Sequence, residues 1–318
     1  MHHTDRCLSK GYIFASADYR LLPPTDGHQV LEDVKDAFAF VSTFSHDREE
    51  GKGNLTVDST RIAVAGTSAG GLCAYLAAIH CKTPKPVAIL SMYGMGGNFF
   101  VSERKFTPAI LIFFQTPHYL VPKKVPFFRN RDLLDPTEFA EFLYPESAKL
   151  PIISGSPLVY HDSSYRIPGY PANPRMLLAR LYLQLGTFLD YWTGLYEPSI
   201  TNTLRPLCED GSPDDEMDFE DLIPEDSKPL FPQLHARTTA WPPTLLVHGT
   251  KDTAVPLAES AHMLSKLSSA GALVRLIEVQ GMEHSFDYEP SAEEKCTGVF
   301  DEVIQFLAGR MGAAGLYN

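Results

Sequence analysis

The stretch RIAVAGTSAGG, residues 61–71, constrains the fold of this chain most strongly. Its first five residues form a short apolar, partly β-branched run, which predicts a buried strand of a parallel sheet. The next five, Gly66 to Gly70, fit the pattern G-x-S-x-G, in which a serine occupies a sharp turn between a strand and a helix. The following GLCAYLAAIHC is rich in residues that favour helices. Ser68 is therefore predicted to be an exposed nucleophile, or alternatively the N-cap of the helix.

Strand and helix patterns alternate on both sides of this turn. The predicted strands are 12–20, 61–65, 86–94, 243–249 and 273–279, and the predicted helices are 27–44, 71–81, 257–271 and 294–311. Such alternation is typical of a mostly parallel, doubly wound α/β sheet with helices on both faces. We expect residues 1–95 and 236–318 to form this core.

Residues 96–235 interrupt the alternation and are predicted to form a helical cap or lid insertion. Its clearest helical stretch is RMLLARLYLQLGTFLDYW, residues 175–192, and its aromatic residues either line a pocket or form a small core. Within the insertion, residues 209–226 carry ten acidic side chains and no Lys or Arg, which indicates a solvated, mobile connector. This loop accounts for most of the net charge of -12, and the acidity argues against nucleic-acid binding.

Two further polar residues follow predicted strands at the same edge of the sheet as Ser68. Asp252 comes after TLLVHG, and His284 comes after LVRLIEV. The chain order Ser68, Asp252, His284 is the order of an α/β-hydrolase catalytic triad. A serine hydroxyl needs a base, which His284 supplies, while Asp252 fixes the imidazole tautomer and stabilises its positive charge.

The motifs SADYRLLPP, GTSAGG, LLVHGTKDTAVP and GMEHSFDY together resemble the α/β-hydrolase fold-3 family, the hormone-sensitive-lipase-like carboxylesterases. The resemblance implies hydrolysis of carboxylic esters with small or medium acyl chains, through an acyl-enzyme and without a cofactor. It implies that Ser68 is the nucleophile, Asp252 and His284 its partners, and the backbone N–H of Ala69 an oxyanion-hole donor. Asp18, Tyr19 and Arg20 match a family motif with an expected structural role.

The chain departs from that family in two places. Thr67 stands where most members carry an aspartate, a change that affects no proton transfer. The family also has three strands before the segment 12–20 and an H-G-G-G oxyanion loop, whereas only eleven residues precede that segment here. We therefore expect an N-terminally truncated fold, with either direct pairing of 12–20 with 61–65 or an incomplete chain. Loss of one oxyanion donor lowers turnover by about a hundred- to a thousandfold.

Two alternative functions stay open at this point: a prolyl-oligopeptidase-like serine peptidase, and a non-catalytic binding protein with an impaired oxyanion hole. The five cysteines are sparse, odd in number and without C-x-x-C spacing, so no metal site is predicted and a reducing compartment is expected. The N-terminal MHHTDRCLSKGY has no apolar core of a secretory signal, so a cytoplasmic location is expected. PAILIFF, residues 108–114, is the most apolar run and is too short to span a membrane. The expected partner is a small-molecule ester, and the sequence predicts no oligomeric state.

Overall fold

The computed structural model describes residues 2–47, 54–100, 102–104, 115–167, 170–209, 216–236 and 240–312. The chain divides into two compact units. Unit 1 contains residues 1–17, 31–98 and 231–318, and unit 2 contains residues 18–30 and 99–230. Unit 2 overlaps the predicted insertion 96–235, and residues 18–30 join it rather than the expected core. The role of this insertion as a cap stays a prediction.

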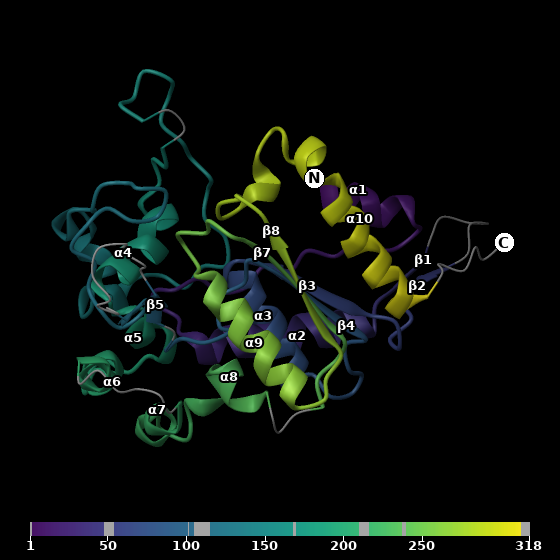
Figure 1. Cartoon of the computed structure of the whole chain (residues 1–318), viewed down its shortest axis with the longest axis horizontal. Helices are drawn as coiled ribbons and strands as arrows, with labels where there is room; N and C mark the ends of the chain where they lie inside the picture. The colour runs from purple at the N-terminus through teal and green to yellow at the C-terminus, as the bar shows by residue number, and fades with distance from the viewer. Residues whose placement is uncertain are drawn as a thin grey trace. The chain divides into compact units, whose positions relative to one another are not determined.

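Unit 1 is built on a parallel sheet of four strands in the order β3, β4, β7, β8. These strands are β3 (Ala63–Thr67), β4 (Ala88–Met92), β7 (Thr244–Gly249) and β8 (Val274–Val279), and Figure 1 shows them side by side. Ala63 pairs with Ala88, Ile89 with Thr244, and Thr244 with Val274. All strands run in one direction, so their C-terminal ends share one edge of the sheet.

Helices cover both faces of this sheet. The helices of unit 1 include α1 (His2–Ser9), α3 (Ala69–His80), α8 (Pro232–His235), α9 (Leu257–Ser269) and α10 (Ala292–Met311). Phe300 and Val303 of α10 pack with Leu90 and Val247 in one core. The alternate strand residues Ile89 and Leu246 pack in a second core, which contains Tyr75 and Ile79 of α3 and Met263 and Leu267 of α9. Because neighbouring residues of a strand point to opposite faces, the two cores confirm the doubly wound α/β fold.

The other strands and helices predicted for the core are confirmed with shifted ends, except the strand 12–20. Helix α2 (Gly27–Ser42) forms as expected, and Phe38 packs against Ala77 of α3. Residues 12–20, however, are not a strand, and the side chains of Ile13 and Phe14 are exposed. An isolated strand is not stable without a hydrogen-bonded neighbour, and the segment pairs with no described strand. Apolar β-type sequence predicted burial there, but no partner strand is present in the described residues.

Two small antiparallel pairs lie outside the main sheet. β1 (Ser45–Asp47) pairs with β2 (Asn54–Thr56), and β5 (Ser102–Arg104) pairs with β6 (Gln115–Pro117). The apolar run 108–114 lies outside the described residues. In the part of the chain that is described, no helix combines the length and the apolar character that crossing a bilayer requires.

Unit 2 is irregular and carries short helices. They are the 3-10 helices η1 (Pro136–Phe142), η2 (Glu146–Lys149), η3 (Pro174–Leu177) and η4 (Lys228–Leu230), and the α-helices α4 (Leu178–Leu185), α5 (Phe188–Thr193), α6 (Ile200–Glu209) and α7 (Glu216–Leu222). The predicted helix 175–192 is split because Gly186 adopts a left-handed φ of 61°. A Cβ at Gly186 would lie 2.8 Å from the backbone nitrogen of Pro122. Glycine is therefore required at this break.

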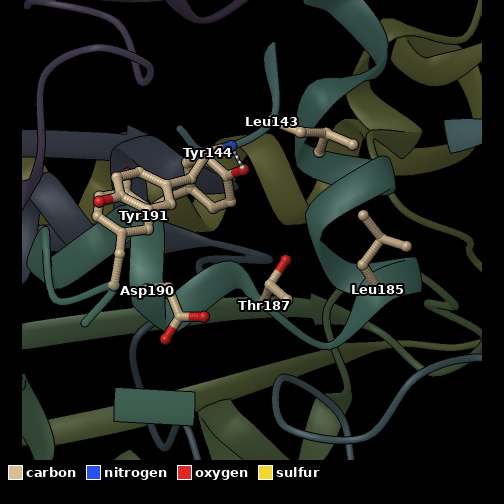
Figure 2. A pocket seen from close by; sticks show the side chains of 7 residues that line it. Leu143, Tyr144, Leu185, Thr187, Asp190 and Tyr191 are labelled. Carbon is tan, nitrogen blue, oxygen red and sulfur yellow. Dashed lines mark hydrogen bonds between the residues drawn. The ribbon is translucent and has the colours of Figure 1, made fainter. Parts of the chain in front are cut away.

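The aromatic residues of unit 2 form a core, and some of them also line a pocket. Phe99, Tyr119 and Phe188 contact one another edge-on or tilted, and the Trp192 indole donates a hydrogen bond to the carbonyl of Leu230. The pocket has a volume of about 240 Å³ (Figure 2). It is lined by Leu143, Tyr144, Leu185, Thr187, Asp190, Tyr191 and Tyr196. Within unit 2, some aromatic residues therefore form a small core and others line a pocket, as the two alternative predictions had it.

Part of the acidic segment 209–226 is helical, unlike the mobile connector that its composition predicted. Residues 216–222 form α7, and Phe219 in this helix is buried. Its ring stacks on Phe100 at 4.4 Å between centroids. The two apolar residues Phe219 and Ile223 anchor the end of the segment, whereas residues 210–215 lie outside the described part. Composition alone overlooked these anchors, because ten charges outweigh two apolar side chains in any average over the segment.

Candidate active site

Ser68 occupies the turn between β3, which ends at Thr67, and α3, which begins at Ala69. Its backbone has φ 52° and ψ -119°, and its side chain makes no capping hydrogen bond. Ser68 therefore stands at the N-cap position of α3, but its side chain does not cap the helix. A positive φ at a non-glycine residue stores strain, as expected of a nucleophile turn.

At two glycines near Ser68, Gly66 and Gly71, an added Cβ atom would clash with backbone atoms. A Cβ at Gly66 would lie 1.8 Å from the carbonyl oxygen of Gly70. A Cβ at Gly71 would lie 2.4 Å from the Cα of Gly94, in the loop after β4. Any larger residue at either position would push α3 away from the sheet. Steric contacts therefore explain Gly66 of the motif and the following Gly71, whereas a Cβ at Gly70 would meet nothing within 4 Å.

The structure brings the three sequence-predicted residues together within unit 1. Asp252 follows β7, and His284 follows β8, at the same edge of the sheet as Ser68. His284 Nε2 lies 2.9 Å from Ser68 Oγ, and His284 Nδ1 lies 2.7 Å from Asp252 Oδ2. A carboxylate can only accept, so Nδ1 carries the proton and Nε2 is free to accept the hydroxyl proton of Ser68.

The Asp252 carboxylate is fully buried and saturated with donors. Oδ1 accepts the backbone N–H groups of Ala254 and Val255, each at 2.9 Å, and Oδ2 faces the His284 ring. Burial alone would raise the pKa of Asp252, but hydrogen bonds from His248 and His284 outweigh it. The pKa of this carboxyl group is therefore held well below its usual value, and Asp252 is ionised at neutral pH.

Tyr93, which the sequence analysis did not single out, supports His284. The Tyr93 ring packs edge-on against the imidazole, 4.8 Å between centroids, and has a positive φ of 39°. The Tyr93 hydroxyl donates to Asp287 Oδ1 and is hydrogen bonded to Thr67. Burial, with the nearby Asp287 charge, raises the pKa of Tyr93, so it remains a neutral donor. In the sequence, the position of Tyr93 at the end of the predicted strand 86–94 was the one feature that could have indicated a place near the site.

Glu283 ties the two loops of the site together. Its Oε1 accepts the backbone N–H of Thr253 at 2.6 Å and that of His284 at 2.9 Å. The loop that carries Asp252 is thereby fixed to the loop that carries His284. Ala69, the predicted oxyanion donor, is the first residue of α3. Its N–H belongs to the positive end of a helix, where an anion is favoured.

The described residues contain no group of three or more His, Cys, Asp or Glu side chains arranged to hold a metal ion. Four cysteines whose surroundings are described, Cys7, Cys73, Cys81 and Cys296, are free thiols. Burial raises the pKa of Cys73 to about 12 and that of Cys81 to about 11, so both are poor nucleophiles. Neither of these two thiols is therefore a candidate nucleophile, whereas the Ser68 hydroxyl faces the imidazole of His284.

Comparison with known proteins supports the fold at both ends of the chain. The BD-FAE family matches residues 1–103, and the prolyl oligopeptidase family matches residues 208–310. A solved structure of an alpha/beta hydrolase superfamily protein from Enterococcus faecalis is 16% identical with a TM-score of 0.54. That match covers 97% of this chain and 83% of the solved one. Together with the parallel sheet, these matches show that the chain has the α/β-hydrolase fold, consistent with its resemblance to the hormone-sensitive-lipase-like esterases.

Its curated relatives are much longer proteins. The non-reducing polyketide synthase mapC' of Penicillium brevicompactum is 24% identical over 313 residues, which are 96% of this chain and 13% of the synthase. The non-reducing polyketide synthase pkbA of Emericella nidulans is 25% identical over 310 residues, covering 93% of this chain and 11% of the synthase. The chain therefore spans about an eighth of the length of the first of these relatives.

Proposed function

We propose that this α/β-hydrolase is a serine hydrolase that cleaves carboxylic esters through Ser68, His284 and Asp252. The observation that carries the proposal is the continuous hydrogen-bonded series Ser68 Oγ, His284 and Asp252, with distances of 2.9 and 2.7 Å. These distances lie in the range that a nucleophile and its base require. The strained backbone at Ser68 further supports a role in catalysis rather than in capping.

The reaction follows from the donors and acceptors of the site. Ser68 Oγ attacks the ester carbonyl carbon while His284 Nε2 takes the hydroxyl proton. The Asp252 carboxylate stabilises the imidazolium, and the N–H of Ala69 donates to the developing oxyanion. His284 then protonates the leaving alkoxide, which departs and leaves an acyl-serine. Water activated by His284 attacks this acyl-enzyme and releases the carboxylic acid, restoring the Ser68 hydroxyl.

Acyl thioesters form a second candidate substrate class. The chain aligns over nearly its whole length with segments of non-reducing polyketide synthases. The same acyl transfer to Ser68 applies to a thioester, with a thiol instead of an alcohol as the leaving group. The prolyl oligopeptidase match over 208–310 keeps peptide bonds as a third class to be tested. A non-catalytic binding role is the alternative if the serine is unreactive.

The first test is labelling of the purified chain with a fluorophosphonate, which reacts with activated serines. We expect stoichiometric labelling of the wild-type chain and none of Ser68→Ala or His284→Ala. Soluble, compact protein that is not labelled would contradict the hydrolase proposal and favour a binding role. A panel of p-nitrophenyl esters, acyl thioesters and proline-containing amides with shared acyl groups then ranks the three substrate classes by kcat/KM.

A further inference from the structure

A second histidine contacts the same oxygen of Asp252 as His284 does. His248, in β7, has a fully buried side chain, and its Nε2 lies 3.2 Å from Asp252 Oδ2. The same Nε2 lies 2.9 Å from the carbonyl oxygen of Val255, and Nδ1 lies 2.8 Å from Ser260 Oγ. The proposed reaction assigns no proton transfer to this imidazole. Its contacts therefore need another explanation.

The contacts fix a proton on Nε2 of His248. The Val255 carbonyl oxygen can only accept, so Nε2 must donate to it. Nδ1 faces the Ser260 hydroxyl, which can donate to it or accept from it. The Nε2–H is shared between the Val255 carbonyl and Asp252 Oδ2, which lie 2.9 and 3.2 Å away. His248 is thus a fixed donor directed at the carboxylate.

These hydrogen bonds form a closed ring around the carboxylate. Val255 donates its N–H to Asp252 Oδ1 and accepts from His248 through its carbonyl. His248 closes the ring at Oδ2 from the strand that precedes the turn, and Ser260 holds the far side of the imidazole from α9. The carboxylate therefore cannot rotate without breaking contacts at both of its oxygens.

We propose that His248 is a positioning residue for the hydrolysis reaction, whose Nε2–H holds the Asp252 carboxylate with Oδ2 directed at His284. This inference rests on the proposed function. A second donor on Oδ2 also lowers the tendency of the carboxylate to take the Nδ1 proton from His284. The imidazolium that forms during attack by Ser68 then keeps both of its protons. His248 acts through Asp252 and touches no reacting atom.

The kinetic test compares His248→Gln with His248→Leu. The Gln amide nitrogen is separated from Cβ by the same number of bonds as Nε2, so it can restore the donor, whereas Leu removes it. We expect kcat of His248→Leu to fall about a hundredfold with KM unchanged, since small misplacements of catalytic groups cost this much. His248→Gln should recover activity to within about tenfold of wild type, on the basis that a donor is restored.

The control variant is His262→Gln, on the same helix as Ser260 and hydrogen bonded to Asn98 instead of Asp252. It should leave kcat unchanged. Fluorophosphonate titration gives the fraction of competent sites, so kcat is expressed per labelled serine. Fewer competent sites with an unchanged kcat per site would overturn the proposal, because that result reports only a structural role. Equal losses for His248→Gln and His248→Leu would also overturn it.

Nitrogen-15 NMR of the histidine rings provides a test that does not depend on turnover. Wild-type His248 should carry a proton on Nε2, with a signal shifted downfield, assigned by its absence in His248→Gln. An Nδ1–H tautomer would overturn the proposal. If wild-type protein resists fluorophosphonate but shows the expected tautomer, the hydrolase proposal fails while the hydrogen bond to Asp252 stands.

Discussion

Two buried aspartates, one in each unit, show how the donors around a carboxylate decide its ionisation. Asp252 in unit 1 receives two backbone N–H groups and two imidazole N–H groups. Asp190 in unit 2 receives the backbone N–H of Thr201 and the hydroxyl of Ser199. The pKa of Asp252 is lowered, whereas burial raises the pKa of Asp190 despite these bonds. Burial raises the pKa of both carboxyl groups, and the number and kind of donors decide whether the net shift is downward or upward.

The largest expected effect separates the two aspartates by activity. Asp252→Asn should lower kcat by about ten-thousandfold, because an amide does not enforce the tautomer of His284. Asp190→Asn should change kcat by less than about tenfold, since its partners belong to a helix terminus in unit 2. Steady-state kinetics on a p-nitrophenyl ester measures both. Comparable losses in the two variants would show that the comparison does not reflect separate roles.

The second largest expected effect is on stability, and it compares an added methyl group at a crowded glycine of unit 1 with one at an open glycine of unit 2. Gly66→Ala places a methyl group 1.8 Å from the Gly70 carbonyl, whereas Gly155 in unit 2 has nothing within 4 Å of an added Cβ. We expect Gly66→Ala to lower the free energy of unfolding by about 3 kcal/mol or to abolish fluorophosphonate labelling, as overpacking does. Gly155→Ala should unfold at the wild-type urea midpoint. Wild-type labelling and stability in Gly66→Ala would contradict the geometry of the turn.

The pH dependence of stability should also differ between the aspartates. Since the folded-state pKa of Asp252 lies below the ordinary value of 3.8, its stabilisation is present above that pH and is lost as pH falls below it. Since the folded-state pKa of Asp190 lies above 3.8, its ionised form costs stability, and this cost is relieved as pH falls toward 3.8.

Urea unfolding between neutral pH and pH 3 tests these signs. The advantage of the wild-type chain over Asp190→Asn should grow as pH falls from neutral to about 4, and the advantage over Asp252→Asn should shrink only below about 4. If both variants showed the same pH dependence, the pKa values of Asp252 and Asp190 would not be shifted in opposite directions.

The smallest expected effect is on stability and concerns Asp190 in unit 2. Ser199→Ala removes a hydroxyl that lies 2.9 Å from Asp190 Oδ1. We expect a loss of about 1 kcal/mol in the free energy of unfolding at neutral pH. The loss should shrink at low pH, where protonated Asp190 no longer needs the donor. Carbon-13 NMR of the Asp190 carboxyl should show its pKa raised further, and an unchanged pKa would contradict this account.

Sequence patterns predicted the parallel sheet, the serine turn and the grouping of Ser68, Asp252 and His284. These features depend on local periodicity and on the rule that parallel strands share a C-terminal edge. The strand predicted at 12–20 was wrong because periodicity records apolar character and not the presence of a partner strand. The contacts of Tyr93 with His284 and of His248 with Asp252 were missed because they depend on side-chain packing between separate elements.

The edge position of β3 has a consequence for solubility. No strand in the described part of the chain pairs with its outer side, and Ala65 there is exposed. An edge strand can template pairing with another polypeptide, and proteins limit this hazard with short edges. β3 has five residues, Ala-Val-Ala-Gly-Thr. Most of them favour strands weakly and offer little side-chain surface for contact with a second strand. The same small side chains permit the turn at Ser68. We therefore expect this edge to pair poorly with another polypeptide and to promote little aggregation.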